Sequence, residues 1–132
     1  MRLLDDEIDL RTLSPLTLAF IGDAVYDLLV REMLVCRGNR PVGVMNNEKI
    51  ELVRCETQAR YAKALFDSLT EEEQSVLKRG QNANAMTVPK HASRIDYHFA
   101  TGFEALFGYL YLKGESERIR ELFKLAVAAE DK

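Results

Sequence analysis

The sequence predicts an all-α fold, and three observations support this prediction. Apolar residues recur at helical spacing through most of the chain, and proline, glycine and capping residues separate the helical segments. β-branched residues are scattered, and no segment alternates polar and apolar residues as a half-buried strand would. The 132 residues can enclose a sizeable core, so we expect one domain over residues 1–132, with residues 1–13 as a flexible N-terminal segment.

The first predicted helix is marked by its start. Ser14 and Pro15 combine an N-cap with proline at the first helical position, and the apolar pattern continues to about residue 37. The stretch RGNRPVG over residues 37–43 contains the glycines and the proline of a connecting loop. A second helix is expected to begin near residues 46–47 and to extend through Leu65.

The next predicted helix is bounded by local signals at both ends. Thr70 and Glu73 form a capping box, and Gly80 is its expected stop. The polar stretch QNANAMTVPK over residues 81–90 is expected to be a loop.

Two more helices are predicted towards the end of the chain. Helical spacing resumes near His91 or Ser93 and ends at Gly114, and the pair TG at residues 101–102 could interrupt it. A final amphipathic helix is expected over residues 115–129.

The composition of the chain bears on its cellular compartment, on membrane association and on the state of its cysteines. No apolar run reaches the roughly 18 residues that a membrane span needs, so no membrane association is expected. The N-terminus has carboxylates where a signal peptide has cations, so we expect a cytoplasmic protein. Cys36 and Cys55 lack the spacing of a metal site and are expected to be reduced, packed thiols.

Two apolar segments contain carboxylates and glycines, which are unfavourable in the middle of a buried helix. The segment LAFIGDAVYDLLV, residues 18–30, includes Gly22 and Asp23, and ATGFEALFGYLYL, residues 100–112, includes Glu104. A glycine inside a helix costs about 1 kcal/mol relative to alanine, and a buried carboxylate needs a partner. If the two helices pack together, Asp23 and Glu104 meet in a small polar pocket.

The two carboxylates are candidate metal ligands. Carboxylates this close repel each other unless a cation lies between them. Oxygen ligands without a matching set of Cys and His favour Mg²⁺, or Mn²⁺, over zinc. Asp27, one turn from Asp23, is either a further ligand or a solvated acid. The residues alone also leave open a structural reading, in which Asp23 pairs with an arginine and the glycines only permit close helix contact.

Three segments, in order, resemble the ribonuclease III family. IGDAVYD, residues 21–27, resembles the signature helix of that family, and FEALFGYLYL, residues 103–112, resembles its second catalytic segment. LTEEEQSVLKRGQNANAMTVPK, residues 69–90, resembles the short form, Mini-ribonuclease III, which lacks a double-stranded-RNA-binding domain. The resemblance covers residues 16–122.

This resemblance implies a homodimeric, metal-dependent endoribonuclease. Such an enzyme cleaves double-stranded RNA to 5′-phosphate and 3′-hydroxyl ends, and the implied substrate is a stem in the large-subunit (23S) ribosomal RNA precursor. By resemblance, Asp23 and Glu104 are its catalytic and metal-binding acids, and Asp27 stands where the family usually has glutamate. Ala19 and Thr101 stand where full-length members have two further acids, a reduction that Mini-ribonuclease III shares.

A basic segment is the expected RNA contact. The chain has a net charge of −3, whereas nucleic-acid binders are more often basic overall, but residues 76–98 contain four cations and one anion. Duplex RNA is recognised mainly through its shape, phosphates and 2′-hydroxyls. The expected RNA-binding residues are Lys78, Arg79, Gln81, Asn82, Asn84, Lys90 and Arg94. Gln81 and Asn84 replace the arginine and lysine expected in the short form, which makes the segment less cationic.

Two other functions stay open at this point. The missing acids at Ala19 and Thr101 fit a catalytically impaired module that binds duplex RNA or assists ribosome assembly. The paired carboxylates alone also fit a helical metallohydrolase acting on a small phosphorylated metabolite. Duplex binding without cleavage would indicate the first function, and turnover without RNA would indicate the second.

Overall fold

The computed structural model describes residues 1–83 and 93–130, and every regular element in these ranges is helical. The α-helices are α1 (Pro15–Cys36), α2 (Val42–Val53), α3 (Cys55–Leu65), α4 (Glu71–Gln81), α5 (Arg94–Leu112) and α6 (Ser116–Glu130). Short 3₁₀ turns lie at Leu10–Thr12 and Phe66–Ser68. The predicted all-α fold class is confirmed.

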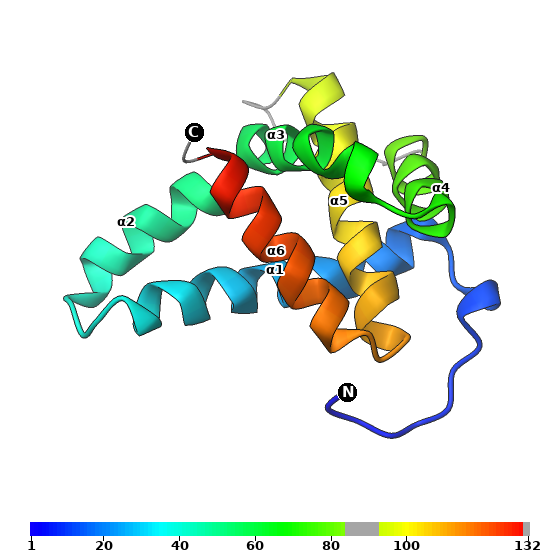
Figure 1. The fold of residues 1–132 in the computed structure, drawn as a ribbon, viewed down its shortest axis with the longest axis horizontal. Helices are drawn as coiled ribbons and strands as arrows, with labels where there is room; N and C mark the ends of the chain where they lie inside the picture. Colours follow the sequence, from blue (N-terminus) through cyan, green and yellow to red (C-terminus); the bar gives the residue numbers. More distant parts are fainter. Residues whose placement is uncertain (84–92, 131–132) are drawn as a thin grey trace.

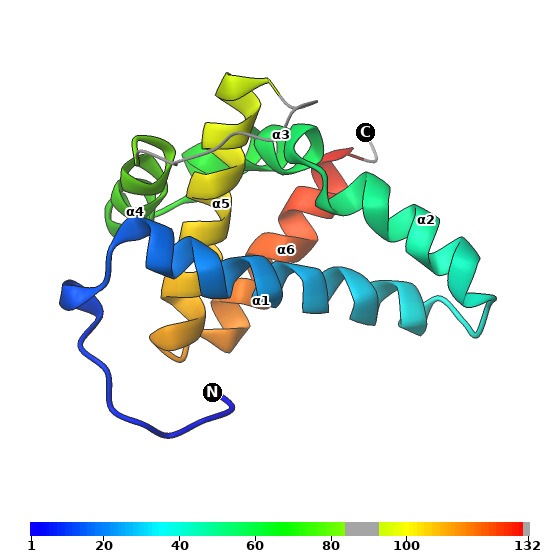
Figure 2. The same ribbon diagram turned by 180° about the vertical axis from the view of Figure 1, so that it is seen from behind.

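Helix α5 is the centre of the arrangement, and α1, α3, α4 and α6 all pack against it (Figures 1 and 2). Helix α1 crosses α5 and then extends with α2 to one side of the body (Figure 1). In the core, the ring centroid of Tyr26 in α1 lies 5.1 Å from that of Phe103 in α5, and Phe103 lies 4.7 Å from Phe107. Burying each of these side chains contributes roughly 1.5–3 kcal/mol, so this aromatic cluster holds α1 to α5.

Two glycines allow α1 and α5 to cross with their backbones in contact. A Cβ atom on Gly22 would overlap the backbone oxygen of Glu104, and one on Gly108 would overlap the backbone oxygen of Leu18. Both distances would be far shorter than 3.0 Å, and real Cβ atoms essentially never come that close to another atom. The glycine in the middle of α1 is therefore required by the crossing.

A second glycine pair brings α4 against α5. A Cβ atom on Gly80 would lie 2.8 Å from the Cα atom of Gly102, and one on Gly102 would lie 2.5 Å from the backbone oxygen of Leu77. Helix α4 ends at Gln81, one residue after the stop predicted at Gly80, but Gly80 does not have the positive φ of a glycine that ends a helix, and its role is this close approach. The break considered at Thr101 and Gly102 is also absent, since α5 runs unbroken through both residues.

The single helix predicted from residues 46–47 through Leu65 is wrong, because two helices occupy this part of the chain and the first begins at Val42. Arg54 between them has an extended backbone, with φ −69° and ψ 155°. Side chains take up the last carbonyls of α2: Thr57 Oγ1 donates to Glu51, Tyr26 Oη donates to Leu52 and Gln58 Nε2 donates to Val53. A helix end leaves such carbonyls unpaired, and apolar spacing carries no information about their partners.

The helix starts predicted from capping residues are confirmed. The Ser14 hydroxyl accepts from the backbone N–H of Thr17 at 3.1 Å, and Thr70 and Glu73 make both hydrogen bonds of a capping box. The last helix is shifted by one residue from its predicted range. Of the loop predicted over residues 81–90, residues 84–90 lie outside the described part of the chain.

The expectations about cysteines and membranes have different outcomes. Both cysteines are free thiols, but Cys36 is exposed, so its predicted packing role is wrong, whereas Cys55 is half-buried. Within residues 1–83 and 93–130, no helix is both long and apolar enough to cross a bilayer.

Candidate active site

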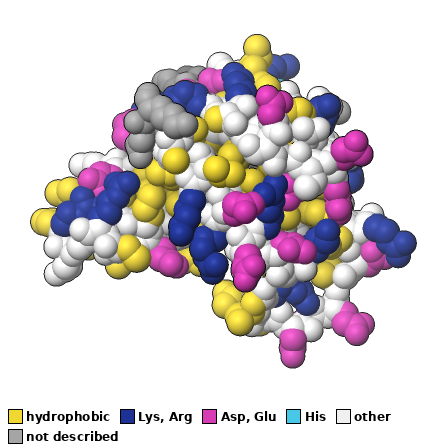
Figure 3. Space-filling view, in the orientation of Figure 1, with side chains coloured by type: hydrophobic (Ala, Val, Ile, Leu, Met, Phe, Trp, Pro, Cys, Tyr) yellow, Lys and Arg dark blue, Asp and Glu magenta, His cyan; other side chains and the backbone are white. Residues whose placement is uncertain are grey.

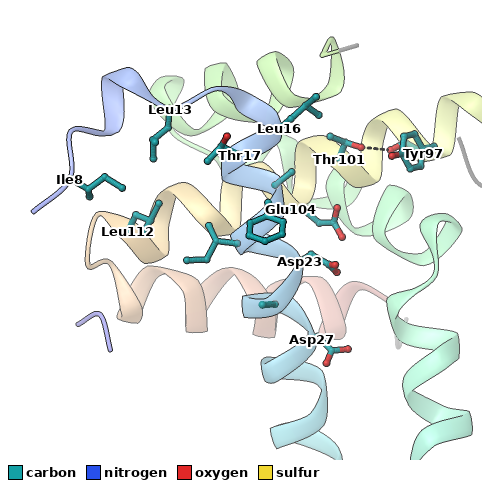
Figure 4. A pocket seen from close by; sticks show the side chains of 14 residues that line it. Ile8, Leu13, Leu16, Thr17, Asp23, Asp27, Tyr97, Thr101, Glu104 and Leu112 are labelled. Atoms are coloured by element: carbon teal, nitrogen blue, oxygen red, sulfur yellow. Dashed lines mark hydrogen bonds between the residues drawn. The ribbon is translucent and has the colours of Figure 1, made fainter. Parts of the chain in front are cut away.

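Asp23 and Glu104 lie together where α1 crosses α5. Both line an open cavity of about 870 Å³, together with Asp27. Figure 4 shows the three carboxyl groups on one side of the crossing, with apolar side chains such as Ile8 and Leu13 on the other. Because Gly22 touches the backbone of Glu104, the contact that brings the helices together also brings together the two carboxyl groups beside it.

Burial beside the cavity strongly shifts the pKa of one of these acids, Glu104. Burial raises the pKa of Glu104 to about 8, and the negative charge of Asp23 and hydrogen bonding with it add to the rise. Hydrogen bonding from Gln58 acts in the opposite direction and lowers this pKa. At pH 7 and without a cation, Glu104 is therefore largely protonated, and this site holds a proton that a metal ion can displace.

We expect the affinity for Mg²⁺ to rise with pH up to about 8 and then to level off. A carboxylate must lose its proton to bind a metal, so the apparent affinity should change about tenfold per pH unit below this pKa. Calorimetric titrations between about pH 6 and about pH 9 measure the effect. Glu104→Gln is the control, because it removes the titrating group, and a wild-type affinity independent of pH over this range would contradict the prediction.

The donor set fits a magnesium ion that keeps several water molecules. Nowhere in the described residues do three or more His, Cys, Asp or Glu side chains converge into a metal-binding group. A closed zinc site needs four ligands of that kind, whereas Mg²⁺ is commonly held by one or two carboxylates, water and substrate phosphate. Asp23 and Glu104 are the two residues that would hold it.

The carboxylate of Asp27 is already paired with two cations. Arg31 Nε lies 2.6 Å from one oxygen, and Lys49 Nζ of α2 lies 3.8 Å from the other. These two cations compete with a metal for the carboxylate of Asp27. Its predicted role as a further metal ligand therefore stays a prediction.

Ala19 and Thr101 line the same cavity without adding an acid to it. The Thr101 hydroxyl donates to the backbone oxygen of Tyr97 at 3.0 Å, one turn earlier in α5 (Figure 4). Thr101 is thus hydrogen-bonded within its own helix, and the described acids that line the cavity are Asp23, Asp27 and Glu104.

The predicted RNA-binding residues lie at the end of α4 and the start of α5. Lys78, Arg79, Asn82 and Arg94 are exposed, Gln81 is half-buried, and Asn84 and Lys90 lie outside the described residues. Arg94 precedes Tyr97, Thr101 and Glu104 by three, seven and ten residues, so it continues the face of α5 that lines the cavity. Lys78 Nζ instead lies 5.2 Å above the ring of Phe66.

Reasoning from the sequence missed Gln58. This α3 side chain is buried, its Nε2 donates to the backbone oxygen of Val53, and it lowers the pKa of Glu104. The only signal in the sequence is one glutamine in a helix of apolar periodicity, which does not indicate what that glutamine faces.

Comparisons with known proteins place the chain in a family. The family model of the ribonuclease III domain matches residues 16–115. Mini-ribonuclease 3 of Thermoanaerobacter sp. (strain X514) is 47% identical over 116 residues, which cover 88% of this chain and 82% of the relative. Mini-ribonuclease 3 of Symbiobacterium thermophilum is 45% identical over 115 residues, covering 87% and 88%.

The fold has a match of its own among solved structures. A crystal structure of a Fusobacterium nucleatum protein superposes with a TM-score of 0.85 at 29% sequence identity, covering 94% of this chain and 95% of that one. The span that matches the family model contains both Asp23 and Glu104. This chain therefore belongs to the ribonuclease III family.

Proposed function

We propose that this protein is a Mg²⁺-dependent endoribonuclease that cleaves double-stranded RNA to 5′-phosphate and 3′-hydroxyl ends. The observation that carries the proposal is the pair of carboxyl groups, Asp23 and Glu104, in an open cavity of a ribonuclease III domain. Mn²⁺, with the same preference for oxygen ligands, could replace Mg²⁺. We further propose that the chain acts in the cytoplasm as one domain over residues 1–132.

The two acids would act by holding the metal and ordering the attacking water. Glu104 gives up its proton when the site is loaded, so both carboxylates are then available as ligands. A metal held by Asp23 and Glu104 would make a water molecule more acidic and would neutralise charge on the phosphodiester. Water attacks phosphorus and the 3′ oxygen leaves, which produces the 5′-phosphate and the 3′-hydroxyl. The helix crossing fixes Asp23 and Glu104 on rigid backbones, so little reorganisation is needed during the reaction.

RNA binding requires cations outside the acidic cavity. Arg94, on the face of α5 that leads to Glu104, is exposed and would contact a phosphate near the cut. Arg79 in the last turn of α4 could add a second contact. Figure 3 shows the face over α3 and α6, where Lys and Arg lie among Asp, Glu and apolar side chains, so we assign RNA to the cavity side instead. Because phosphate contacts release counterions, the affinity should fall steeply with salt.

We propose a homodimer formed through the exposed side of α1. Phe20 is 83% exposed and lies between Leu16 and Leu28, which are also exposed, on the helix that contains Asp23. A two-fold axis at this apolar stripe would bring together two copies of the site, one for each strand of the duplex.

Phe20→Glu is expected to weaken this dimer at least about 30-fold, equivalent to about 2 kcal/mol, because an aromatic residue at the interface centre would be replaced by a charge. Sedimentation velocity over a range of concentrations measures the association. Val42→Glu is the matched control, because Val42 is 76% exposed but lies on α2, away from the stripe. Equal dimerisation of the two variants would place the interface elsewhere.

The test of the function is cleavage of a labelled RNA duplex with Mg²⁺ and with EDTA, beside a single-stranded RNA of the same sequence. We expect cleavage of the duplex only, and only with metal. Duplex binding without cleavage would replace the proposal with the RNA-binding or ribosome-assembly module. If the duplex is neither bound nor cut, a small phosphorylated substrate becomes the better hypothesis.

For the biological substrate we propose a duplex stem in the large-subunit (23S) ribosomal RNA precursor. This step rests on the resemblance of residues 69–90 to the short form of the family. Faster cleavage of such a stem than of a shuffled duplex of equal length is the expected result. Equal rates would mean that the protein does not select this stem by itself.

A further inference from the structure

Two cations from different helices meet at one carboxylate beside the cavity. Arg31 Nε, one turn further along α1, donates to Asp27 Oδ2 at 2.6 Å, and Lys49 Nζ of α2 lies 3.8 Å from Asp27 Oδ1. Asp27 itself lines the cavity that contains Asp23 and Glu104. One negative charge thus faces two positive charges, which leaves a surplus of positive charge at the edge of an acidic cavity.

The ammonium group of Lys49 has unused hydrogen-bond donors. At 3.8 Å it forms an ion pair with Asp27 but is too far away for a hydrogen bond, and its side chain donates to no other described residue. Its side chain is only 20% exposed, so packing between α1 and α2 restricts its position. The neighbouring acid in α2, Glu48, is taken by Arg40 at 2.7 Å. An ammonium carries three donors, so this group is available to an anion from solution.

Stabilisation of the fold explains little of this arrangement. The pair of Arg31 and Asp27 lies within one helix, with the arginine side chain 57% exposed, and such pairs contribute little to stability. Lys49 connects α2 to α1 only through a long ion pair. The Nη groups of Arg31 have no partner within residues 1–83 and 93–130, so both cations still have donors to offer.

These cations lie beyond one end of the acid pair. Figure 4 shows Asp27 at the opposite end of the cavity from Tyr97. Asp23 and Glu104 lie between them. Asp27 follows Asp23 by one turn of α1, a rise of roughly 6 Å. An RNA strand with its scissile phosphate at the two acids therefore has a neighbouring phosphate close to the cations. Phosphate contacts of this kind fix the register of a nucleic acid without reading its bases.

We propose that Arg31 and Lys49 bind the backbone phosphate next to the one that is cut, and that Asp27 holds both cations in place for it. The inference rests on the proposed function for the presence of duplex RNA. It assigns neither cation a contact with the metal or with the reacting atoms. Loss of either cation should therefore weaken RNA binding and its dependence on salt, and leave the metal affinity intact.

The test compares Lys49→Met, which keeps an unbranched side chain and removes the charge, with Lys124→Met in α6. Lys124 is exposed and lines a different cavity, so its loss changes the net charge equally but away from this site. Fluorescence polarisation of a labelled RNA duplex in EDTA gives the affinity and its salt dependence without cutting. We expect Lys49→Met to bind at least about fivefold more weakly and to lower the slope of log affinity against log salt by about one, whereas Lys124→Met keeps the wild-type slope. Lys49→Arg, which retains the charge, should restore the slope.

A wild-type slope in Lys49→Met would overturn the proposal. Equal losses in Lys49→Met and Lys124→Met would overturn it too, because net charge would then explain both. So would weaker Mn²⁺ binding by Lys49→Met, measured by calorimetry without RNA, since Lys49 would then support the metal site. If Lys49→Met does not fold, Arg31→Gln, at an exposed position of α1, is measured in the same way with the same expected losses. A wild-type protein that binds the duplex but does not cut it with Mg²⁺ would refute the proposed function, while the binding slopes would still decide the role of the two cations.

Discussion

Asp23→Asn and Glu104→Gln are each expected to slow cleavage of duplex RNA by at least about 10²–10³-fold without loss of the fold. Each substitution keeps the shape of the side chain and removes one of the two charges that would hold the metal. Stability should not fall. The folded-state pKa of Glu104, about 8, lies above its ordinary value of 4.5, so ionising this group as the pH rises works against folding, and a neutral glutamine avoids that penalty at pH 7.

Single-turnover cleavage rates at saturating Mg²⁺, together with thermal unfolding curves, measure both parts of this prediction. Asp27→Asn is the informative comparison, because Asp27 lines the same cavity but pairs with Arg31 and Lys49. A smaller loss is expected for Asp27→Asn than for the other two variants. If Asp23→Asn or Glu104→Gln cuts the duplex at the wild-type rate, the assignment of that acid is wrong.

Gly22→Ala is expected to destabilise the fold by about 3 kcal/mol or more, or to prevent folding. The new methyl group would overlap the backbone oxygen of Glu104. It would also lie too close to the backbone nitrogen of Gly108, so a small shift away from Glu104 could not relieve the overlap. Backbone atoms inside two packed helices cannot move aside as a flexible side chain can. The helices would have to separate, which would also move Asp23 away from Glu104 and reduce cleavage.

Urea unfolding monitored by circular dichroism gives the free energy of unfolding for this variant. Gly43→Ala is the control, since Gly43 lies in α2 and a Cβ atom there would meet nothing within 4 Å. Gly43→Ala should leave stability unchanged or raise it by up to about 1 kcal/mol, because alanine is the better helix former. A Gly22→Ala protein that unfolds at the wild-type urea concentration would show that α1 and α5 do not meet through this glycine.

Helix starts with a side-chain cap could be read directly from the sequence. Ser14 and Thr70 accept backbone N–H groups three residues later, so the signal and its partner lie in the same short segment. The boundary between α2 and α3 could not be read in this way. Its stabilising contacts include Tyr26, which lies 26 residues away from Leu52, the residue whose carbonyl it pairs.

The meaning of the glycines also depended on the partner helix. In the sequence, Gly80 resembles a helix stop and Gly102 resembles a break, because isolated glycine weakens a helix. In the structure, Gly80 lies in the last turn of α4 and Gly102 lies inside α5, and each comes close to the backbone of the other helix. Helix propensity describes how a residue affects its own helix, whereas the close approach of α4 and α5 depends on the contact between two helices.

The sequence by itself determined the all-α class and the capped helix starts, and it singled out Asp23 and Glu104 as candidate acids, each within its own short motif. Each is encoded in residues close to one another along the chain, through apolar spacing, caps and short motifs. Tertiary structure alone decided that Lys49 of α2 pairs with Asp27 and that burial raises the pKa of Glu104. The physical reason is that burial and hydrogen bonding depend on which groups the packed helices bring within reach, and these groups are distant in sequence.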